Sequence, residues 1–548
     1  MRFRIGLCGY EWSGWADREN SPLMSWRQRL MARKSLESLQ ANPEDHGGHS
    51  LERVLGPIGL MSLGVGSIIG TGIFVLIGQV VHDQTGPSVM VSFLLAAVAC
   101  GFAGLCYAEF ASMVPVAGSA YTYAYATLGE LMAWIIGWDL ILEYAVSGAA
   151  VAVSWTGYFN EFLALLTRGS GTPWKLPKAI SEAPLAFDLQ TGQYSLTGGW
   201  VNLPAVLVTA ALSVLLIVGI RESTRFNTLM VAIKVGVLLL VIGVGIAYID
   251  PANWVPFAPY GWGGVTLFGH TIIGQPAPLG KPVGMIAGSA IIFFSYIGFD
   301  SVSTQAEETK NPQRDLPIGI IGSLLVCSVL YVSVAAVLTG MVPYQDLHTE
   351  APVSHAFHQR GIWWAEGLIA IGALTGITSV VLVSLLGQTR ILMSMARDGL
   401  LPHRFFEEVH PRFHTPWRAT IVTGIFVALL AGLLPLGVLA EMVSIGTLFA
   451  FAIVCAAVLI MRRTYPDAHR PFRVPWMPWT PILGMAICML LMISLPWENW
   501  VRLFGWLAIG LVIYFSYGHR HSRINRHPEA ALTASGIAHE VPIDELKG

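Results

Sequence analysis

A glycine-rich stretch inside the first long apolar run has the composition of a backbone binding site. Residues 64–74 read GVGSIIGTGIF, where four glycines fall within nine positions and Ser67 and Thr71 stand among them. Similar glycine spacing also occurs where two membrane helices pack closely, which is the alternative interpretation. Because these glycines are denser and more central than a packing seam needs, we expect the helix to unwind there. Unwinding leaves peptide N–H and C=O groups available to a ligand.

A second interruption of the same kind falls in the sixth apolar run. The run IIFFSYIGFDSVSTQAEETKNP is broken near its middle by Ser295, Gly298, Asp300 and Ser301. Two interrupted segments in corresponding halves of a chain indicate an inverted-repeat membrane carrier with its site at the bilayer midplane. The two breaks are five runs apart, and because five is odd, the second copy must be inverted relative to the first.

The chemistry of two unwound segments suits a small zwitterion. Amide groups at the start of the second half-helix, at Thr71 and Gly72, can bind a carboxylate. Carbonyl groups at the unwound ends, around Ser67–Ile69 and Phe294–Ile297, can accept hydrogen bonds from an ammonium group. This pattern favours an amino acid over a sugar as the ligand.

Lys234 lies in the apolar run MVAIKVGVLLLVIG, where a charged group is costly and is a functional candidate by default. One interpretation is a lysine that extends its ammonium group to the membrane interface. The other is a buried ammonium that exchanges a proton during a transport cycle. We favour the second, because the residue lies deeper than an interfacial lysine.

Acidic residues also occur at membrane depth. Glu143 follows Asp139 by one helical turn in GWDLILEYAVSG, and we expect Glu143 to belong to the site or to proton transfer. Asp139 is expected close enough to the membrane surface to be solvated. Asp300 follows the second break and either pairs with Lys234 or caps the second half-helix. Glu109 is expected to be an interfacial or pairing residue.

Other chemistries have no support in the sequence. The six cysteines show no CxxC spacing, and the histidines expected in loops have no metal-ligand spacing on a helix. No nucleophile, base and acid lie together at one membrane depth, so an enzyme is not expected. A net charge of −2 without a basic patch argues against nucleic acid. We predict no metal and no cofactor.

The elements that must position these residues are membrane-spanning helices. Of the 548 residues, 54% are apolar and only 12% are charged, and runs of about 20 apolar residues recur along the chain. The sequence therefore predicts an all-α polytopic membrane protein of about twelve spans. The expected spans are residues 57–80, 87–112, 130–160, 202–220, 227–249, 284–305, 316–342, 362–395, 418–434, 437–461, 480–496 and 499–518.

The distribution of basic residues orients these spans. Most of the 32 Lys and Arg residues flank the ends that share a side with the two tails, which places both termini in the cytoplasm. The first 55 residues contain no signal-peptide apolar region, and Met1, Met24 and Met31 remain alternative starts. The expected division is a tail (1–55), a ten-helix core (56–461, with repeats 56–249 and 284–461), two further helices (462–520) and a second tail (521–548).

Long motifs then carry a resemblance to a known family. GVGSIIGTGIFVLIG, PVAGSAYTYAYATLGELMAWIIGWDLILEYAV, FFSYIGFDSVSTQAEETKNPQRDLPIGI, GQTRILMSMARDGLLP and RPFRVPWMPWTPILG resemble the amino acid–polyamine–organocation superfamily. More narrowly, they are similar to bacterial members of its cationic amino acid transporter branch. The likeness extends from about residue 30 to 520. It implies the leucine-transporter-type fold of five-plus-five inverted repeats, here with two extra helices.

The resemblance also implies roles for particular residues. The substrate carboxylate is expected at Gly70, Thr71 and Gly72, and the ammonium at carbonyls near Ile68, Ile69 and Phe294. Phe294 and Ile297 are expected to line or gate the pocket. The resemblance implies that Glu143 lies in the substrate pocket. It also implies that Lys234, Glu143 and Asp300 take part in proton coupling. Ser384 stands where a bulkier residue is expected in some relatives, and a smaller side chain there would admit a longer amino acid, such as a cationic one.

These observations predict a transporter of L-amino acids coupled to protons, in the plasma membrane of a bacterium. An obligate exchanger and a non-transporting amino acid sensor on the same scaffold remain alternatives. The expected partners are an amino acid, protons and the lipid bilayer, without nucleic acid. The sequence leaves open which amino acids are carried, the direction of flux and the oligomeric state.

Overall fold

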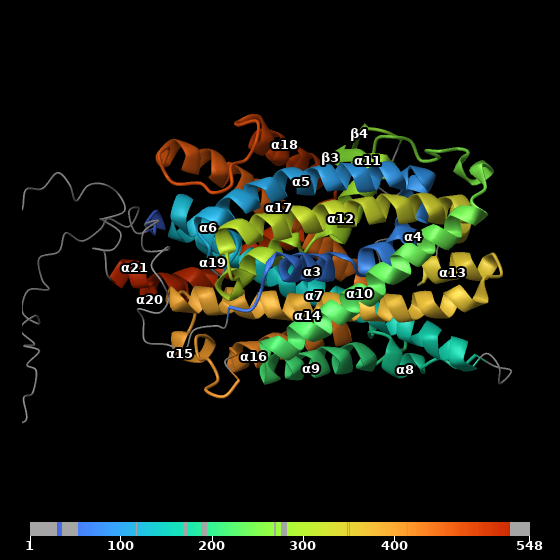
Figure 1. Ribbon diagram of the computed structural model, residues 1–548, viewed down its shortest axis with the longest axis horizontal. Coiled ribbons are helices and arrows are strands. Elements are labelled where there is room, and N and C mark those ends of the chain that lie inside the picture. The colour runs from blue at the N-terminus through green and yellow to red at the C-terminus, as the bar shows by residue number, and fades with distance from the viewer. Residues whose placement is uncertain are drawn as a thin grey trace, which may run out of the picture.

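The computed structural model of the chain describes residues 30–34, 53–116, 118–167, 173–187, 194–267, 270–275, 282–347, 349, 351–413 and 415–526. The expected tails, 1–55 and 521–548, lie mostly outside these residues. What is described is a bundle of long helices that run roughly side by side (Figure 1). Proline and glycine punctuate the helix ends, as at Pro57 and Pro312 in the first turns of two helices.

The first half of the core contains the first five expected spans. Its elements are α3 (Pro57–Ile68), η2 (Gly72–Leu76), α4 (Ile77–Val80), η3 (Val81–Thr85), η4 (Gly86–Ser88), α5 (Val89–Met113), α6 (Ala120–Thr127), α7 (Glu130–Thr167), α9 (Leu203–Val218) and α10 (Ile220–Gly245). The short helix α6 was not expected.

The second half of the core likewise begins with a broken span and continues with four unbroken spans, and two additional helices follow it. The elements of these two parts are α11 (Met285–Ile292), η9 (Phe293–Tyr296), η10 (Phe299–Glu308), α12 (Pro312–Met341), α13 (Pro352–Gln359), α14 (Trp363–Arg397), α16 (Trp417–Leu433), α17 (Leu436–Thr464), α18 (Trp479–Ile493) and α19 (Trp497–Ile513).

The apolar lengths of these helices confirm a polytopic membrane protein. Eight described helical segments are long and apolar enough to cross a membrane, and one of them, 57–113, contains two expected spans. Three shorter apolar helices, α9, α16 and α18, complete the set. Every expected span therefore corresponds to an observed helix, with ends that shift by a few residues.

The packing of the helices shows the symmetry of an inverted repeat. Helices α5, α7 and α9 pack on their counterparts in the second half, which are α12, α14 and α16. The contact of α7 with α17 is mirrored by that of α14 with α10, and the contact of α7 with α16 by that of α14 with α9. Exchanging the two halves preserves these contacts, as the five-plus-five fold requires.

Both predicted breaks are present. Helix α3 ends at Ile68, and Ile69 has an extended backbone with φ −76° and ψ 101° before helical structure resumes at Thr71. In the sixth span, Ile297 leaves the helical conformation, with φ −59° and ψ 137°, and Gly298 has φ +117°, a left-handed conformation that favours glycine. The chain then continues as the 3-10 helix η10.

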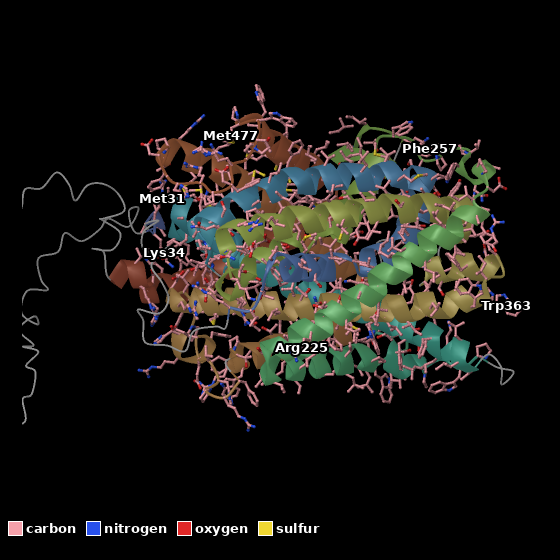
Figure 2. The ribbon with its side chains drawn as sticks, viewed as in Figure 1. Met31, Lys34, Arg225, Phe257, Trp363 and Met477 are labelled. Carbon is pink, nitrogen blue, oxygen red and sulfur yellow. The ribbon has the colours of Figure 1, made fainter. Side chains whose placement is uncertain are left out.

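The two ends of the bundle differ in their covering. We call one the tail end, which carries residues 30–34, α15 (His403–Phe406), α20 (His519–His521) and α21 (Arg523–Arg526). The other, the loop end, carries α8 (Lys178–Ser181), α13 and the hairpin β1–β2 (Leu185–Phe187, Tyr194–Leu196). The hairpin β3–β4 (Val265–Leu267, His270–Ile273) lies along one side of the bundle, beside α11 (Figure 1). Figure 2 shows Lys34 near the tail end and Phe257 and Trp363 at the loop end.

Candidate functional site

The two breaks touch each other at the centre of the bundle. A Cβ atom added at Gly72 would lie 2.5 Å from the Cα of Ser295, and one added at Gly298 would lie 2.8 Å from the Cβ of Ser67. The Ser67 hydroxyl donates a hydrogen bond of 2.7 Å to the Gly298 carbonyl. Glycine is needed at both positions because the two backbones approach so closely.

A small central cavity lies beside this contact. Its volume of about 10 Å³ admits about one water molecule. Four segments line it, and the lining residues are Ser67, Glu143, Tyr144, Ser147, Ile297, Gly298, Ser301, Val383 and Ser384. The site is thus closed in this conformation.

Polar side chains at the two breaks lack protein partners. The hydroxyl groups of Thr71 and Ser295 are buried, and neither forms a hydrogen bond within the described residues. Most buried polar atoms in proteins have a partner, so such atoms mark a place where a ligand can bind. Thr71 also stands at the start of the second half-helix, where the first amides have no intrahelical acceptor.

Several carbonyl groups expected to bind an ammonium group are already engaged. The Tyr331 hydroxyl donates to the carbonyls of Ile68, at 2.8 Å, and Ser295, at 3.0 Å. Tyr331 of α12 therefore joins the two breaks. A carbonyl oxygen has two lone pairs, so each retains capacity for a second donor.

Lys234 of α10 reaches the first break from the side. Its Nζ atom donates to the carbonyls of Gly66, at 2.7 Å, and Ile69, at 2.8 Å, and to the Ser379 hydroxyl of α14, at 2.7 Å. The residue is 0% exposed, so the interpretation as an interfacial lysine is wrong. A cation at the C-terminal end of α3 is favourable because unpaired carbonyls gather there.

The buried carboxyl groups occupy different surroundings. Glu143 lines the central cavity, and neither carboxylate oxygen has a hydrogen-bond partner within the described residues. Asp300, in the first turn of η10, accepts a hydrogen bond from the Tyr144 hydroxyl and does not bond to Lys234. Asp139 is fully buried, and a Cβ added at Gly446 would meet its carboxylate, so the expected solvation of Asp139 is wrong.

The structure brings only part of the predicted site together. Of the predicted residues, Glu143, Ile297 and Ser384 line the central cavity, whereas Phe294 lines a different one. Ile68, Ile69, Gly70, Thr71 and Gly72 form the buried break alongside. Three lining residues were not predicted from the sequence: Tyr144, Ser147 and Val383. Ser147 follows Glu143 by four positions, so helical spacing from Glu143 indicates it.

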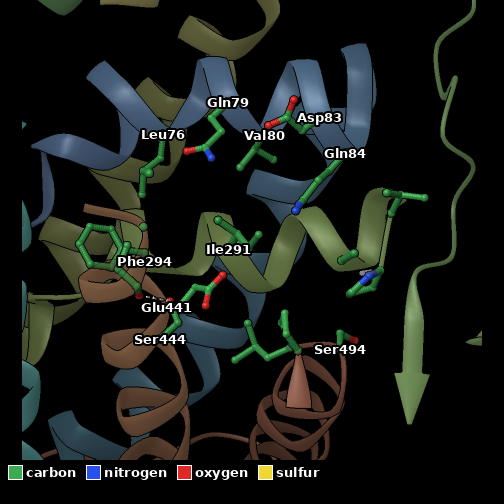
Figure 3. Close-up of a pocket in the computed structure, with 17 residues that line it drawn as sticks. Leu76, Gln79, Val80, Asp83, Gln84, Ile291, Phe294, Glu441, Ser444 and Ser494 are labelled. Atoms are coloured by element: carbon green, nitrogen blue, oxygen red, sulfur yellow. Dashed lines mark hydrogen bonds between the residues drawn. The ribbon is translucent and has the colours of Figure 1, made fainter. Parts of the chain in front are cut away.

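A larger cavity opens between the breaks and the loop end. This loop-end cavity has a volume of about 300 Å³ and is mainly apolar (Figure 3). Its lining residues are Leu76, Gln79, Val80, Asp83, Gln84, Pro282, Val283, Ala287, Ile291, Phe294, Gly437, Ala440, Glu441, Ser444, Ser494, Leu495 and Pro496. Phe294 lies three residues before Ile297 of the central cavity, so η9 separates the two cavities.

Toward the tail end, ion pairs close the bundle. Arg390 donates to Glu308 through Nε at 2.9 Å and Nη2 at 2.8 Å, and both side chains are 1% exposed. About two turns further along α14, Arg397 pairs with Glu307 at 2.9 Å. Both pairs join η10, the segment after the second break, to α14.

The segment that leads into α3 adds to this closure. The amides of Val54 and Leu55 donate to the Glu308 carbonyl, each at 3.0 Å, and the Lys310 amide donates to the Leu55 carbonyl at 2.9 Å. Leu55 and Thr309 thereby form a parallel β-bridge. Lys34, from the described part of the N-terminal region, pairs with Asp398 at the end of α14.

Comparison with known proteins identifies the relatives of this chain. A family model described as amino acid permease matches residues 55–515. The chain is 47% identical to the branched-chain amino acid permease BcaP of Bacillus subtilis (strain 168), over 91% of this chain and 99% of that protein. It is 43% identical to the methylthioribose transporter of the same organism, with the same coverage. A vacuolar cationic amino acid transporter 4 of Arabidopsis thaliana is 40% identical over 80% of this chain and 68% of its own length.

Proposed function

The chain belongs to the amino acid permease family, and from this premise we propose that it carries L-amino acids together with protons by alternating access. It is an integral membrane protein of a transporter family whose relatives are permeases, not enzymes. The observation that supports the proposal most is the pair of touching breaks, where two buried hydroxyl groups have no hydrogen-bond partner among the described residues and lie beside a closed cavity.

We propose that the amino acid binds across the two breaks. Its carboxylate would bind the amides of Gly70–Gly72 and the Thr71 hydroxyl, which is the arrangement that a helix N-terminus offers to an anion. Its ammonium group would share the carbonyls of Ile68, Ile69 and Phe294 with their present donors. Its side chain would extend into the central cavity toward Glu143, Ile297 and Ser384.

Proton coupling is proposed to depend on Lys234. While charged, its Nζ atom holds two carbonyls at the end of α3 and the Ser379 hydroxyl of α14. Loss of the proton would remove a donor and a charge, and the first break would then be held to α14 less tightly, with the hydrogen bond from the Ser379 hydroxyl to the Gly66 carbonyl remaining. Glu143 and Asp300 are proposed as further proton-linked groups, because both are buried carboxyl groups close to the second break.

The placement in the cell is part of the proposal. Basic residues concentrate toward the tails, which supports a cytoplasmic tail end and a loop end outside the cell. The bacterial relatives favour the plasma membrane of a bacterium. Residues 56–249 and 284–461 would form the two repeats that rock against each other, with 462–520 as an addition.

Uptake by purified protein in liposomes tests the proposal directly. Radiolabelled leucine, lysine and methylthioribose should be offered with and without an inward proton gradient, because the relatives' names include each of these substrate classes. We expect accumulation of an amino acid that the gradient drives. Flux that needs internal amino acid but no gradient would indicate an exchanger, and binding without flux would indicate a sensor. Preferential accumulation of methylthioribose would contradict an amino acid as the substrate.

A further inference from the structure

A surface groove that shares no lining residue with the central cavity lies between the start of α12 and the segment that precedes α18. This α12 groove has a volume of about 570 Å³ and is open along one side. Its lining residues are Gln313, Arg314, Pro317, Ile318, Ile321, Gly322, Pro471 and Phe472. In chain order, the polar residues Gln313 and Arg314 come at the tail end of α12, and the apolar residues follow toward the membrane interior.

One wall of the groove is held in place by a buried carboxylate. Glu109 of α5 accepts hydrogen bonds from Arg462 at 2.7 Å and from the Val474 amide at 2.7 Å, and it pairs with Arg470 at 3.4 Å. The Phe472 amide donates to the Ser112 hydroxyl at 3.3 Å. The segment around Phe472 is therefore fixed against α5, and this wall of the groove has a defined position in the fold.

The surroundings place the groove at the level of the lipid headgroups. Trp476 and Trp479, a few residues after Phe472, are 80% and 65% exposed, and exposed tryptophan is typical of the membrane–water interface. Arg314 and Arg473 are exposed. Arg314 forms no ion pair with another described residue, so its charge is available to an anion.

We propose that the α12 groove binds an anionic glycerophospholipid. The phosphate group would bind Arg314 and Gln313, and an acyl chain would lie along Ile318, Ile321 and Phe472. The groove matches this ligand because its basic end is complementary to the anionic headgroup and its apolar part is complementary to the acyl chain. A soluble phosphate would use only the mouth of the groove.

The lipid would contact the helix that supports the first break. A Cβ added at Gly319 would meet Leu60 of α3 at 2.8 Å, and one added at Gly322 would meet Met61 at 3.0 Å. Gly322, which lines the groove, thus lies next to α3, and Gly319, outside the groove lining, packs on α3 almost one turn earlier. Occupancy would brace α3 more than two turns before its break at Ile69.

Lipid binding to the full-length purified protein tests the proposal. Native mass spectrometry should be used to compare retention of phosphatidylglycerol and phosphatidylcholine by the wild type, Arg314→Ala and Arg404→Ala. Arg404 is an exposed arginine of α15, away from α12 at the same end of the bundle, and serves as the matched control (Figure 1). We expect the wild type and Arg404→Ala to prefer phosphatidylglycerol, and Arg314→Ala to bind it about fivefold more weakly.

A second variant tests the apolar part of the groove. Ile318→Trp fills the groove while Arg314 remains, so it should also lose phosphatidylglycerol. Equal retention by Arg314→Ala and Arg404→Ala, or unchanged retention by Ile318→Trp, would overturn the proposal. Full displacement of the lipid by glycerol 3-phosphate would show a site for soluble anions instead, and it would overturn the assignment to a lipid. None of these outcomes depends on which substrate is transported.

Discussion

The two ends of the bundle are built differently around the same pair of breaks. Toward the loop end, an apolar cavity of about 300 Å³ reaches Phe294. Toward the tail end, buried and half-buried ion pairs join η10 to α14. The difference shows a molecule that is closed at the tail end and hollow toward the loop end, as a carrier facing one side of the membrane must be.

The chemistry of the closure explains why it can be reversible. Burying a charge pair costs about as much in desolvation as the attraction returns, so a pair such as Arg390 and Glu308 adds little net stability. It does fix which residues face each other. A closure made of charge pairs can open when water re-enters, whereas an apolar seal would resist opening. The tail end thus gains a defined closed position without a deep energy minimum.

The largest effect is expected at the contact between the two breaks, where the tail-end and loop-end halves of the molecule meet. Replacing Gly72 by valine should abolish amino acid binding, with a loss of at least about 100-fold in affinity, because the added Cβ collides with the Ser295 backbone. Isothermal titration with the purified protein measures this loss. Gly243→Val is the matched control, because nothing lies within 4 Å of a Cβ added there.

A milder change keeps this test informative if Gly72→Val fails to fold. Thr71→Val preserves the shape of the side chain and removes its unpartnered hydroxyl, and it should weaken binding about tenfold. Unchanged affinity in Thr71→Val would place the carboxylate elsewhere.

Lys234→Ala should separate binding from accumulation. The change leaves the carbonyls of Gly66 and Ile69 and the Ser379 hydroxyl without their shared donor. The tie between the tail-end half of the first break and α14 is then weakened to the hydrogen bond of 2.9 Å that the Ser379 hydroxyl donates to the Gly66 carbonyl. We expect gradient-driven uptake to fall at least about tenfold while affinity changes little. Uptake in liposomes and titration measure the two effects, and Lys178→Ala, at an exposed site, is the control. Full accumulation by Lys234→Ala would exclude the lysine from coupling.

Substitution of Arg390 tests the closure at the tail end, because this residue forms the buried ion pair with Glu308. Arg390→Met leaves Glu308 charged and buried, and we expect the free energy of unfolding to fall by about 3–5 kcal/mol. The double variant Arg390→Met/Glu308→Leu should recover most of this stability, since no buried charge is then unpaired. Denaturation in detergent micelles checks both. Equal stability of the single and double variants would show that Glu308 finds another partner.

The ion pair of Arg397 with Glu307 should have the smallest effect on the free energy of unfolding. Arg397→Ala removes a pair whose arginine is 30% exposed, so solvent screens the attraction, and the stability should change by less than about 1 kcal/mol. The same denaturation experiment, repeated at high salt, should reduce the difference further. A loss as large as that of Arg390→Met would show that the two pairs act as one unit.

The fold was largely predictable because apolar length and glycine density are local properties of the chain. Each expected span became a helix, and the breaks at Ile69 and Gly298 fall within the two predicted stretches. The role of Tyr331 was not predictable, since its hydroxyl joins two breaks that lie far away in the sequence. Contacts of that kind depend on how the helices rotate, which apolar runs do not specify.

The site was predictable in part for the same reason. Glu143 was found as a polar group in an apolar helix and Ser384 through the family resemblance, and both line the central cavity. Asp139 was misjudged, because its distance from the helix end gave no sign that Gly446 covers it. The partner of Asp300 was also open between two alternatives, and the structure gives a third, the Tyr144 hydroxyl.

The bridge between Leu55 and Thr309 has a mechanical consequence. It joins the lead-in of the first broken helix to the exit of the second by main-chain hydrogen bonds, which do not depend on side-chain identity. On the tail-end side, α3 and η10 are therefore coupled to each other through this bridge. A tilt of either one pulls the other, so release toward the tails involves both breaks at once.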